Sequence, residues 1–121
     1  NMDTIKLNNG VEMPQLGYGV FQVSPVEAER CVADALSVGY RMIDTAQAYQ
    51  NEEGVGTAIR KSGIKRENVF LVDKVWMGNY EDDAAARSID ESRRKLGTDC
   101  IDLMLLLSAT ATTPIVRWKT P

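Results

Sequence analysis

Histidine is absent from the 121 residues of this chain. Histidine is the commonest general base near neutral pH and the commonest metal ligand, so its absence argues against histidine-dependent catalysis and against a metal site. Only two cysteines are present, Cys31 in a helix-like segment and Cys100 in a strand-like one. We expect both to be reduced, buried, apolar side chains rather than a disulfide, which is typical of a cytoplasmic protein.

Long apolar runs and blocks of basic residues are missing as well. No stretch reaches the roughly 20 apolar residues that a membrane-spanning helix needs, and the first residues lack the charged-then-apolar pattern of a leader. The net charge is −3, with 14 basic against 17 acidic residues. Nucleic acids and membranes are therefore poor candidates as partners.

The chain instead alternates between strand-like and helix-like segments. A hairpin is predicted over residues 5–17, because two short alternating runs flank Asn9-Gly10, a pair typical of tight turns. Short apolar runs predict further strands at residues 16–20, 40–46, 68–76 and 100–107. Polar caps and closing glycines predict helices at residues 24–39, 52–61 and 79–97, with Asn79 as the cap of the third.

Strands that alternate with helices imply parallel βαβ units, as in an α/β barrel. The pattern Gly17-x-Gly19 leaves open a doubly wound, dinucleotide-binding sheet. However, that pattern lacks the third glycine of the dinucleotide-binding fingerprint and does not open a helix directly. The barrel is therefore the favoured interpretation.

Polar residues stand at the predicted strand ends, where an α/β barrel gathers its catalytic groups. Asp44 ends one strand, Tyr49 follows it in the next loop, and Lys74 lies near the end of the following strand. Taken singly, such an aspartate is usually a turn former and such a lysine usually reaches out to solvent. Lys74, however, has apolar neighbours and needs an anionic partner if it is buried, and Asp44 can supply one.

This combination predicts a reaction. An ammonium near a phenol favours the ionised phenol, so Lys74 would prepare Tyr49 to give its proton to a carbonyl oxygen. Asp44 would hold Lys74 in place. Reduction of the carbonyl also needs a hydride, which no side chain can provide, so a nicotinamide cofactor is required.

Four segments of the sequence resemble the aldo-keto reductases, especially the bacterial branch that includes diketogluconate and methylglyoxal reductases. The segments are "GVEMPQLGYGVFQV", "YRMIDTAQAYQNEEGVG", "VFLVDKVW" and "SIDESRRKLGTDCIDLMLL". Together the resemblance runs from Ile5 to Leu106, with the motifs in the family's order and spacing. It implies an α/β fold, in which an N-terminal β-hairpin precedes the first half of a (β/α)8 TIM barrel, and an oxidoreductase that reduces aldehydes and ketones with NADPH.

The resemblance also implies roles for individual residues. Tyr49 would be the proton donor, and Asp44 and Lys74 would be the other catalytic residues. The residues implied at the site are Asp44, Tyr49 and Lys74 for catalysis, Gly19, Val20 and Asp44 for the cofactor, and Phe21, Tyr49 and Trp76 for the substrate.

The chain departs from the family at its C-terminal end. Leu107 stands where the family's fourth strand leads into a histidine that orients the carbonyl. A complete barrel needs about 250 residues, and the second half carries the family's site for the adenosine 2′-phosphate. We therefore divide the chain into residues 1–107, the N-terminal half of a barrel, and residues 108–121, an aperiodic tail outside the family pattern.

Two interpretations of function follow. In the first, the chain carries reductase sequence but is truncated and inactive by itself. In the second, it is a non-catalytic half-barrel that self-associates, because half a barrel leaves strand edges and an apolar wall uncovered. A shifted reading frame from Leu106 onward would permit the family's next segment, so we interpret the tail as family sequence read out of frame, with a variable C-terminus as the alternative.

Overall fold

The computed structural model of the chain describes residues 3–107, 112–115 and 118–119, and it has the α/β architecture expected from the sequence. Its centre is a five-stranded sheet in the order β3-β4-β5-β7-β8. The first four strands run parallel, and β8 runs antiparallel to β7. The strands span Tyr18–Gly19 (β3), Met42–Asp44 (β4), Phe70–Val75 (β5), Leu103–Leu107 (β7) and Thr112–Ile115 (β8).

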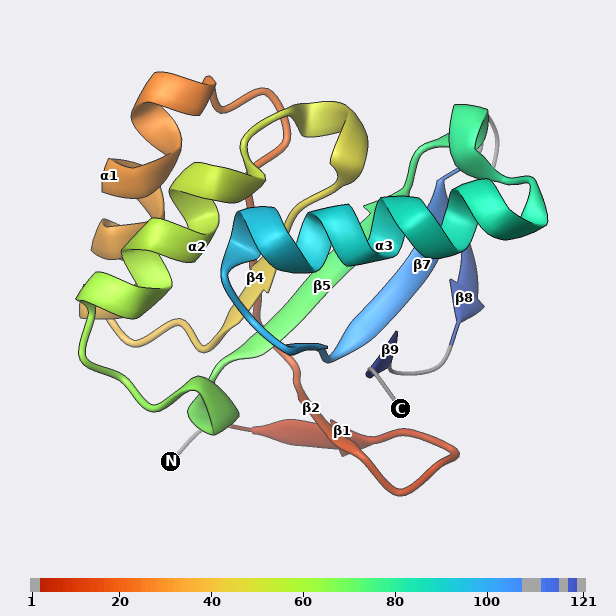
Figure 1. The fold of residues 1–121 in the computed structure, drawn as a ribbon. Helices are drawn as coiled ribbons and strands as arrows, with labels where there is room; N and C mark the ends of the chain where they lie inside the picture. Colours follow the sequence, from red (N-terminus) through yellow and green to blue (C-terminus); the bar gives the residue numbers. More distant parts are fainter. Residues whose placement is uncertain (1–2, 108–111, 116–117, 120–121) are drawn as a thin grey trace.

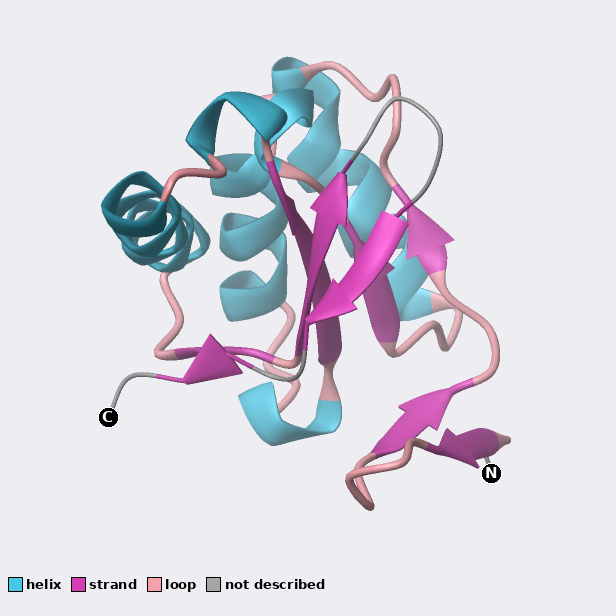
Figure 2. Cartoon of the chain, turned by 90° about the vertical axis from the view of Figure 1, so that its right-hand side faces the viewer, coloured by secondary structure: helices cyan, strands magenta, loops and turns pink. Residues whose placement is uncertain are grey.

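Three helices cover one side of this sheet, as Figures 1 and 2 show. They are α1 (Pro25–Ser37), α2 (Glu52–Lys61) and α3 (Asp82–Leu96). The predicted cap of α1 is confirmed, because Ser24 Oγ accepts a hydrogen bond of 3.3 Å from the backbone N–H of Glu27. Gly97 ends α3 in the left-handed conformation, with φ of 65°, as a closing glycine should.

The start of α3 differs from the prediction. Asn79 does not cap the helix, which begins at Asp82 after the N-cap residue Glu81. Asn79 belongs instead to a 3₁₀ turn, η3 (Met77–Asn79), whose backbone closes from the Asn79 N–H to the Trp76 carbonyl at 2.8 Å. The Asn79 amide is used elsewhere, in a hydrogen bond to Gln47. A local capping signal was therefore overridden by a contact across 32 positions of sequence.

The N-terminal hairpin is confirmed, and it lies apart from the main sheet at one end of the molecule (Figure 1). Its strands are β1 (Thr4–Lys6) and β2 (Glu12–Pro14), paired antiparallel. At the turn Gly10 has φ of 86°, a conformation that suits glycine.

The predicted strand over residues 100–107 is broken in two. Cys100–Ile101 forms β6, and β7 begins at Leu103. Asp102 interrupts the run because its carboxylate accepts from the Leu71 N–H at 2.9 Å and pairs with Arg66 at 2.8 Å. The Arg66 guanidinium also donates to the carbonyls of Val69 and Cys100 at 2.6 Å, so this cluster ties the beginning of β5 to β6.

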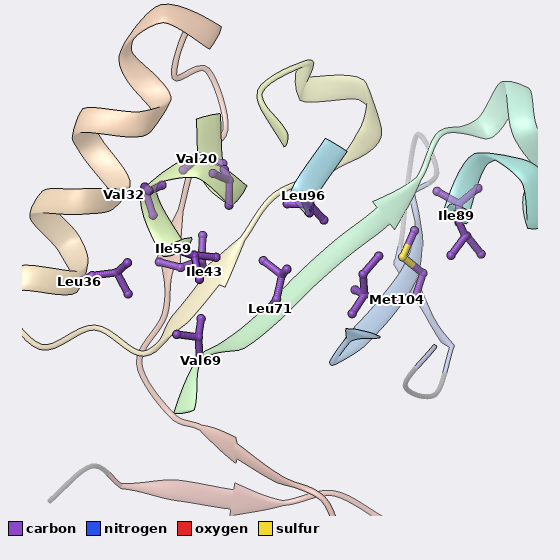
Figure 3. Close-up of a cluster of buried hydrophobic side chains, with 14 residues drawn as sticks. Val20, Val32, Leu36, Ile43, Ile59, Val69, Leu71, Ile89, Leu96 and Met104 are labelled. Carbon is purple, nitrogen blue, oxygen red and sulfur yellow. The ribbon is translucent and has the colours of Figure 1, made fainter. Parts of the chain in front are cut away.

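The core lies between the sheet and the helices, and Figure 3 shows its side chains. Ile43 from β4, Leu71 from β5 and Met104 from β7 are almost fully buried there. Helices α2 and α3 approach closely because Gly56 has no side chain: a Cβ at this position would lie 2.2 Å from the Leu96 carbonyl oxygen. The outward faces of the strands and the apolar stripes of the helices thus make one continuous core.

The tail contains two short strands, which its aperiodic sequence did not predict. Leu107 pairs with Thr112 and Met104 with Ile115, so β8 covers the edge of β7; Figure 2 shows this edge nearest the viewer. A further strand, β9 (Trp118–Lys119), pairs with β6. An open strand edge offers unpaired backbone groups, and pairing with β8 satisfies them.

The inner side of the sheet is also less open than expected. Phe70 and Val72 alternate with the core-facing residues of β5, yet they are only 7% and 3% exposed. Large exposed apolar side chains do occur among the described residues, but they belong to loops, helix surfaces and the hairpin: Ile5, Leu16, Phe21, Val26, Val38, Trp76, Met77 and Tyr80. Met42, Leu103 and Leu105 share this face and are half-buried, so among the described residues the inner side of the sheet is only partly covered.

Neither cysteine forms a disulfide within the described residues. Both are half-buried rather than fully buried. In the same part of the chain, every helix is too short or too polar to cross a membrane.

Candidate active site

The carboxyl ends of β3, β4 and β5 lie side by side, because the strands are parallel and in register. Gly19 pairs with Asp44, and Asp44 with Val72. The loops that follow these strands therefore share one rim of the molecule, and every residue that the sequence predicted for the site belongs to this rim.

Lys74 and Asp44 form the predicted ion pair. The Lys74 ammonium donates to Asp44 Oδ1 and, at 3.0 Å, to the backbone carbonyl of Thr45. The Lys74 side chain is 9% exposed, whereas the Asp44 side chain is 40% exposed. A buried ammonium is therefore held between strand β5 and the end of β4, while its carboxylate partner still meets solvent.

Tyr49 lies next to this pair. It ends a 3₁₀ turn, η1 (Gln47–Tyr49), and its N–H donates to the Ala46 carbonyl at 3.0 Å. The Lys74 ammonium lies 5.3 Å from the centroid of the Tyr49 ring. The phenol is thus positioned beside a cation that cannot easily leave, because that cation is bound to two oxygen atoms.

One aromatic side chain borders the tyrosine, and a second follows β5. The rings of Phe21 and Tyr49 are 5.3 Å apart and inclined by 53°. Phe21 is largely exposed, and Trp76, at the end of β5, is 43% exposed. These residues give the rim an apolar edge that a small carbon compound could contact.

Gly19 and Val20 contribute through their backbone. A Cβ at Gly19 would have no neighbour within 4 Å, so the space in front of this residue is open. The Val20 side chain is fully buried in the core, and its N–H donates to the Asp44 carbonyl at 3.0 Å. An open, side-chain-free stretch of backbone beside Asp44 fits the approach of a flat ring such as a nicotinamide.

Asn51 is a site residue that the sequence reasoning missed. It is 1% exposed, and its Oδ1 accepts from the Thr45 hydroxyl at 2.7 Å. Its Nδ2 donates to the carbonyls of Val20 and Val23, at 3.1 and 3.0 Å. Asn51 therefore ties the loop after β3 to the loop after β4. Although Asn51 directly precedes helix α2, its side chain makes no capping bond.

Asp73 and Glu52 form a buried acidic pair on the helix side of β5. Each has an oxygen, Asp73 Oδ2 and Glu52 Oε2, without a donor among the described residues. Burial, followed by the hydrogen bond and charge of Glu52, raises the pKa of Asp73 well above its usual value, although Lys74 opposes the rise. A proton held by Asp73, which this shift favours, would supply the missing donor between the two carboxyl groups. The alternation of strand residues gave the only sequence signal, since Asp73 falls on the core-facing side.

Chemically, the rim brings together a phenol ring, a buried ammonium and a carboxylate that binds the ammonium. A model of the aldo/keto reductase family matches residues 10–117. The chain belongs to this family.

Similarity to individual aldo/keto reductases is high over the matched part. The chain is 49% identical to morphine 6-dehydrogenase from Pseudomonas putida over 102 residues, which are 84% of the chain and 34% of that protein. It is 45% identical to the methylglyoxal reductase DkgA of Escherichia coli over 106 residues, 88% of the chain and 38% of that protein. The chain thus spans little more than a third of the length of these aldo/keto reductases.

Solved aldo/keto reductases share the fold as well. The crystal structure of the enzyme from Brucella melitensis superposes with a TM-score of 0.86 and 50% identity, and the match covers 88% of this chain and 40% of that one. The described fold therefore corresponds to the first part of an aldo/keto reductase barrel, which confirms the fold predicted from the sequence. Leu107, the last residue of β7, occupies the position at which we expected the family's histidine.

Proposed function

We propose that this chain carries the catalytic residues of an NADPH-dependent reductase of aldehydes and ketones. The observation that supports this most directly is the buried Lys74 ammonium, held by Asp44 and lying 5.3 Å from the Tyr49 ring. The names of relatives, glyoxal reductase and methylglyoxal reductase, point to small dicarbonyl compounds as the first substrates to test.

In the proposed reaction, Tyr49 donates the proton of its hydroxyl group to the carbonyl oxygen, and the product is an alcohol. A bound nicotinamide supplies the hydride that reaches the carbonyl carbon. Lys74 stabilises the phenolate that Tyr49 becomes, and Asp44 keeps the ammonium in place. The open backbone at Gly19 would adjoin the nicotinamide ring, and Phe21 and Trp76 would exclude water from the apolar part of the substrate.

We also propose that the 121 residues alone reduce carbonyls poorly. Orientation of substrate and cofactor supplies much of such a rate, and relatives use a chain more than twice as long for the task. Leu107 provides no hydrogen-bond donor where we expected a histidine to orient the carbonyl.

A chimera tests the catalytic proposal. Residues 1–106 of this chain are joined to the remaining part of the Escherichia coli methylglyoxal reductase, and NADPH oxidation is followed with methylglyoxal. We expect activity in the chimera and a loss of about 10²–10⁴-fold in kcat in its Tyr49→Phe variant. A folded chimera whose Tyr49→Phe variant keeps full activity would refute the role of Tyr49.

The second interpretation is a non-catalytic half-barrel that pairs with another copy, and it was motivated by open strand edges and an uncovered apolar wall. In the described residues β8 covers the β7 edge and Val72 is 3% exposed, whereas β3 and β8 are themselves edge strands that another copy could pair with. Light scattering of the purified chain distinguishes the two interpretations. A stable dimer would favour the self-associating half-barrel, and a monomer would rule it out.

A further inference from the structure

Gln47 makes four hydrogen bonds with its side-chain amide, although it lies in a short loop turn. The amide nitrogen donates to the hydroxyls of Ser88 and Ser92 on α3, both at 3.1 Å. The amide oxygen accepts from the backbone N–H of Trp76 at 2.7 Å and from the Asn79 amide at 3.2 Å. Gln47 thus joins three parts of the molecule: the turn that holds Tyr49, the turn η3 after β5, and helix α3.

This arrangement uses the full hydrogen-bonding capacity of a glutamine, two donors and two acceptor sites. The orientation of the amide is fixed as well. The Trp76 N–H can only donate, so it requires the oxygen, and the Ser88 hydroxyl already donates to the Ala85 carbonyl at 2.8 Å, so it requires the nitrogen. A saturated amide with one permitted orientation holds its partners in one geometry.

The partner that matters for the site is Trp76. Gln47 binds the first residue of its turn through the Trp76 N–H and the last through the Asn79 side chain, so both ends of the turn are held. The indole itself packs over Gly78, where a Cβ would lie 2.8 Å from Trp76 Nε1. Gln47 therefore holds the backbone of Trp76, and Gly78 packs against its half-exposed indole ring.

We propose that Gln47 is a positioning residue of the substrate pocket. Gln47 fixes the position of Trp76, a wall of that pocket, relative to Tyr49. Its side chain comes from η1, the turn that holds Tyr49, and it binds both the turn that begins at Trp76 and helix α3. The statement that Trp76 is a pocket wall rests on the proposed function. The statement that Gln47 immobilises Trp76 does not, and the two are tested separately.

The first test needs no substitution. The chain has two tryptophans, so labelling with ¹⁵N-tryptophan gives two backbone amide signals, and Trp118→Phe assigns them. We expect the Trp76 N–H to exchange with solvent at least about tenfold more slowly than an unprotected amide, because it is bound to Gln47. Exchange at the unprotected rate would overturn the proposal, whether or not any variant folds.

The second test compares variants in the Trp118→Phe background, where Trp76 is the only fluorophore of its kind. In Gln47→Ala we expect acrylamide to quench Trp76 roughly twofold more strongly and its anisotropy to fall, since ring motion on the nanosecond scale is released. Gln47→Glu keeps the acceptor for the Trp76 and Asn79 donors but loses the two donors to α3, so its values should lie between those of the wild type and Gln47→Ala. The control is Gln50→Asn, in the same loop, and it should change neither quantity. Unchanged quenching in Gln47→Ala would refute the proposal.

The third test concerns the pocket, in the chimera described above. Gln47→Ala should raise KM for methylglyoxal severalfold and leave kcat within about twofold, because substrate binding is affected more than the chemical step. An equal loss of kcat with unchanged KM would refute the pocket role. If the chimera has no activity although Gln47→Ala frees Trp76, the proposed function fails and the positioning role of Gln47 stands.

Discussion

The two members of the Lys74–Asp44 pair have unequal surroundings, so they should respond differently to substitution. Asp44→Asn leaves an ammonium that is 9% exposed without its counter-charge, and we expect a loss of about 2–3 kcal/mol in the free energy of unfolding. Lys74→Met leaves a carboxylate that is 40% exposed and can be hydrated, and it removes the donor to the buried Thr45 carbonyl, so the cost should be smaller, about 1–2 kcal/mol. Urea unfolding measures both, and equal costs would show that the ammonium is better solvated than its burial indicates.

The Asp73–Glu52 pair should make stability depend on pH. The pKa of Asp73 is raised in the folded chain, so this group contributes stability that is fully present below its ordinary pKa and is lost as the pH rises through the raised value. The Asn amide of Asp73→Asn can donate to Glu52 at any pH, so we expect this variant not to lose stability in this way. At pH 8 its free energy of unfolding should exceed that of the wild type by about 1–3 kcal/mol.

Urea unfolding at pH 5 and pH 8 checks this expectation. Asp99→Asn, at a fully exposed carboxylate, is the control and should leave the dependence on pH unchanged. If the free energy of unfolding changed equally with pH in the wild type and in Asp73→Asn, the two carboxyl groups would not share a proton.

At the residue scale the sequence predicted the Lys74–Asp44 ion pair and missed the amide side chains that join the surrounding loops. Asp44 and Lys74 were predicted because a charge in an apolar strand requires a partner. Gln47 and Asn51 could not be predicted, because their partners lie on other elements: Ser88 is 41 positions from Gln47, and Val20 is 31 from Asn51. An uncharged amide in a loop has no local signature that distinguishes a saturated network from simple exposure to solvent.

At the scale of elements, the contact between α2 and α3 depends on Gly56. A Cβ there would lie 2.2 Å from the Leu96 carbonyl oxygen and 2.7 Å from the Leu96 Cα. These are backbone atoms, which cannot avoid the clash by adopting another rotamer. We expect Gly56→Ala to lower the free energy of unfolding by about 2–3 kcal/mol, because the helices must separate. Gly19→Ala, with open space around the new methyl group, is the control for thermal melting and should melt as the wild type does. Equal melting temperatures for both variants would mean that α3 shifts without cost.

Element boundaries were the weakest part of the sequence-based prediction. The order of strands and helices followed from periodicity and from closing glycines, which are local signals. The late start of α3 and the break at Asp102 followed from tertiary hydrogen bonds to Gln47 and Leu71, which periodicity does not contain. Strand β8 was missed for the same reason, since its pairing depends on an edge that β7 presents.

For the whole molecule, the described tail should act against aggregation. Deleting residues 108–121 removes β8 and leaves the edge of β7, "LMLLL", open to other copies. We expect the shortened chain to form larger species than the full chain at the same concentration, as measured by light scattering. The control is a full chain with Val26→Ser, which removes an exposed apolar side chain far from that edge. If the shortened chain has the mass of the full one, β8 does not protect the edge.

The antiparallel pairing of β8 also bears on the order in which the chain folds. Leu107 and Thr112 are five positions apart, whereas the parallel partners Val72 and Leu103 are thirty-one apart. Closing a short loop costs less entropy and is faster, so the β7–β8 hairpin should form before β7 finds β5. When the complete unfolded chain refolds, the apolar strand would then already carry a partner on one side while its slower, parallel neighbour is still being reached, which shortens the time in which two unfolded chains can join by mistake.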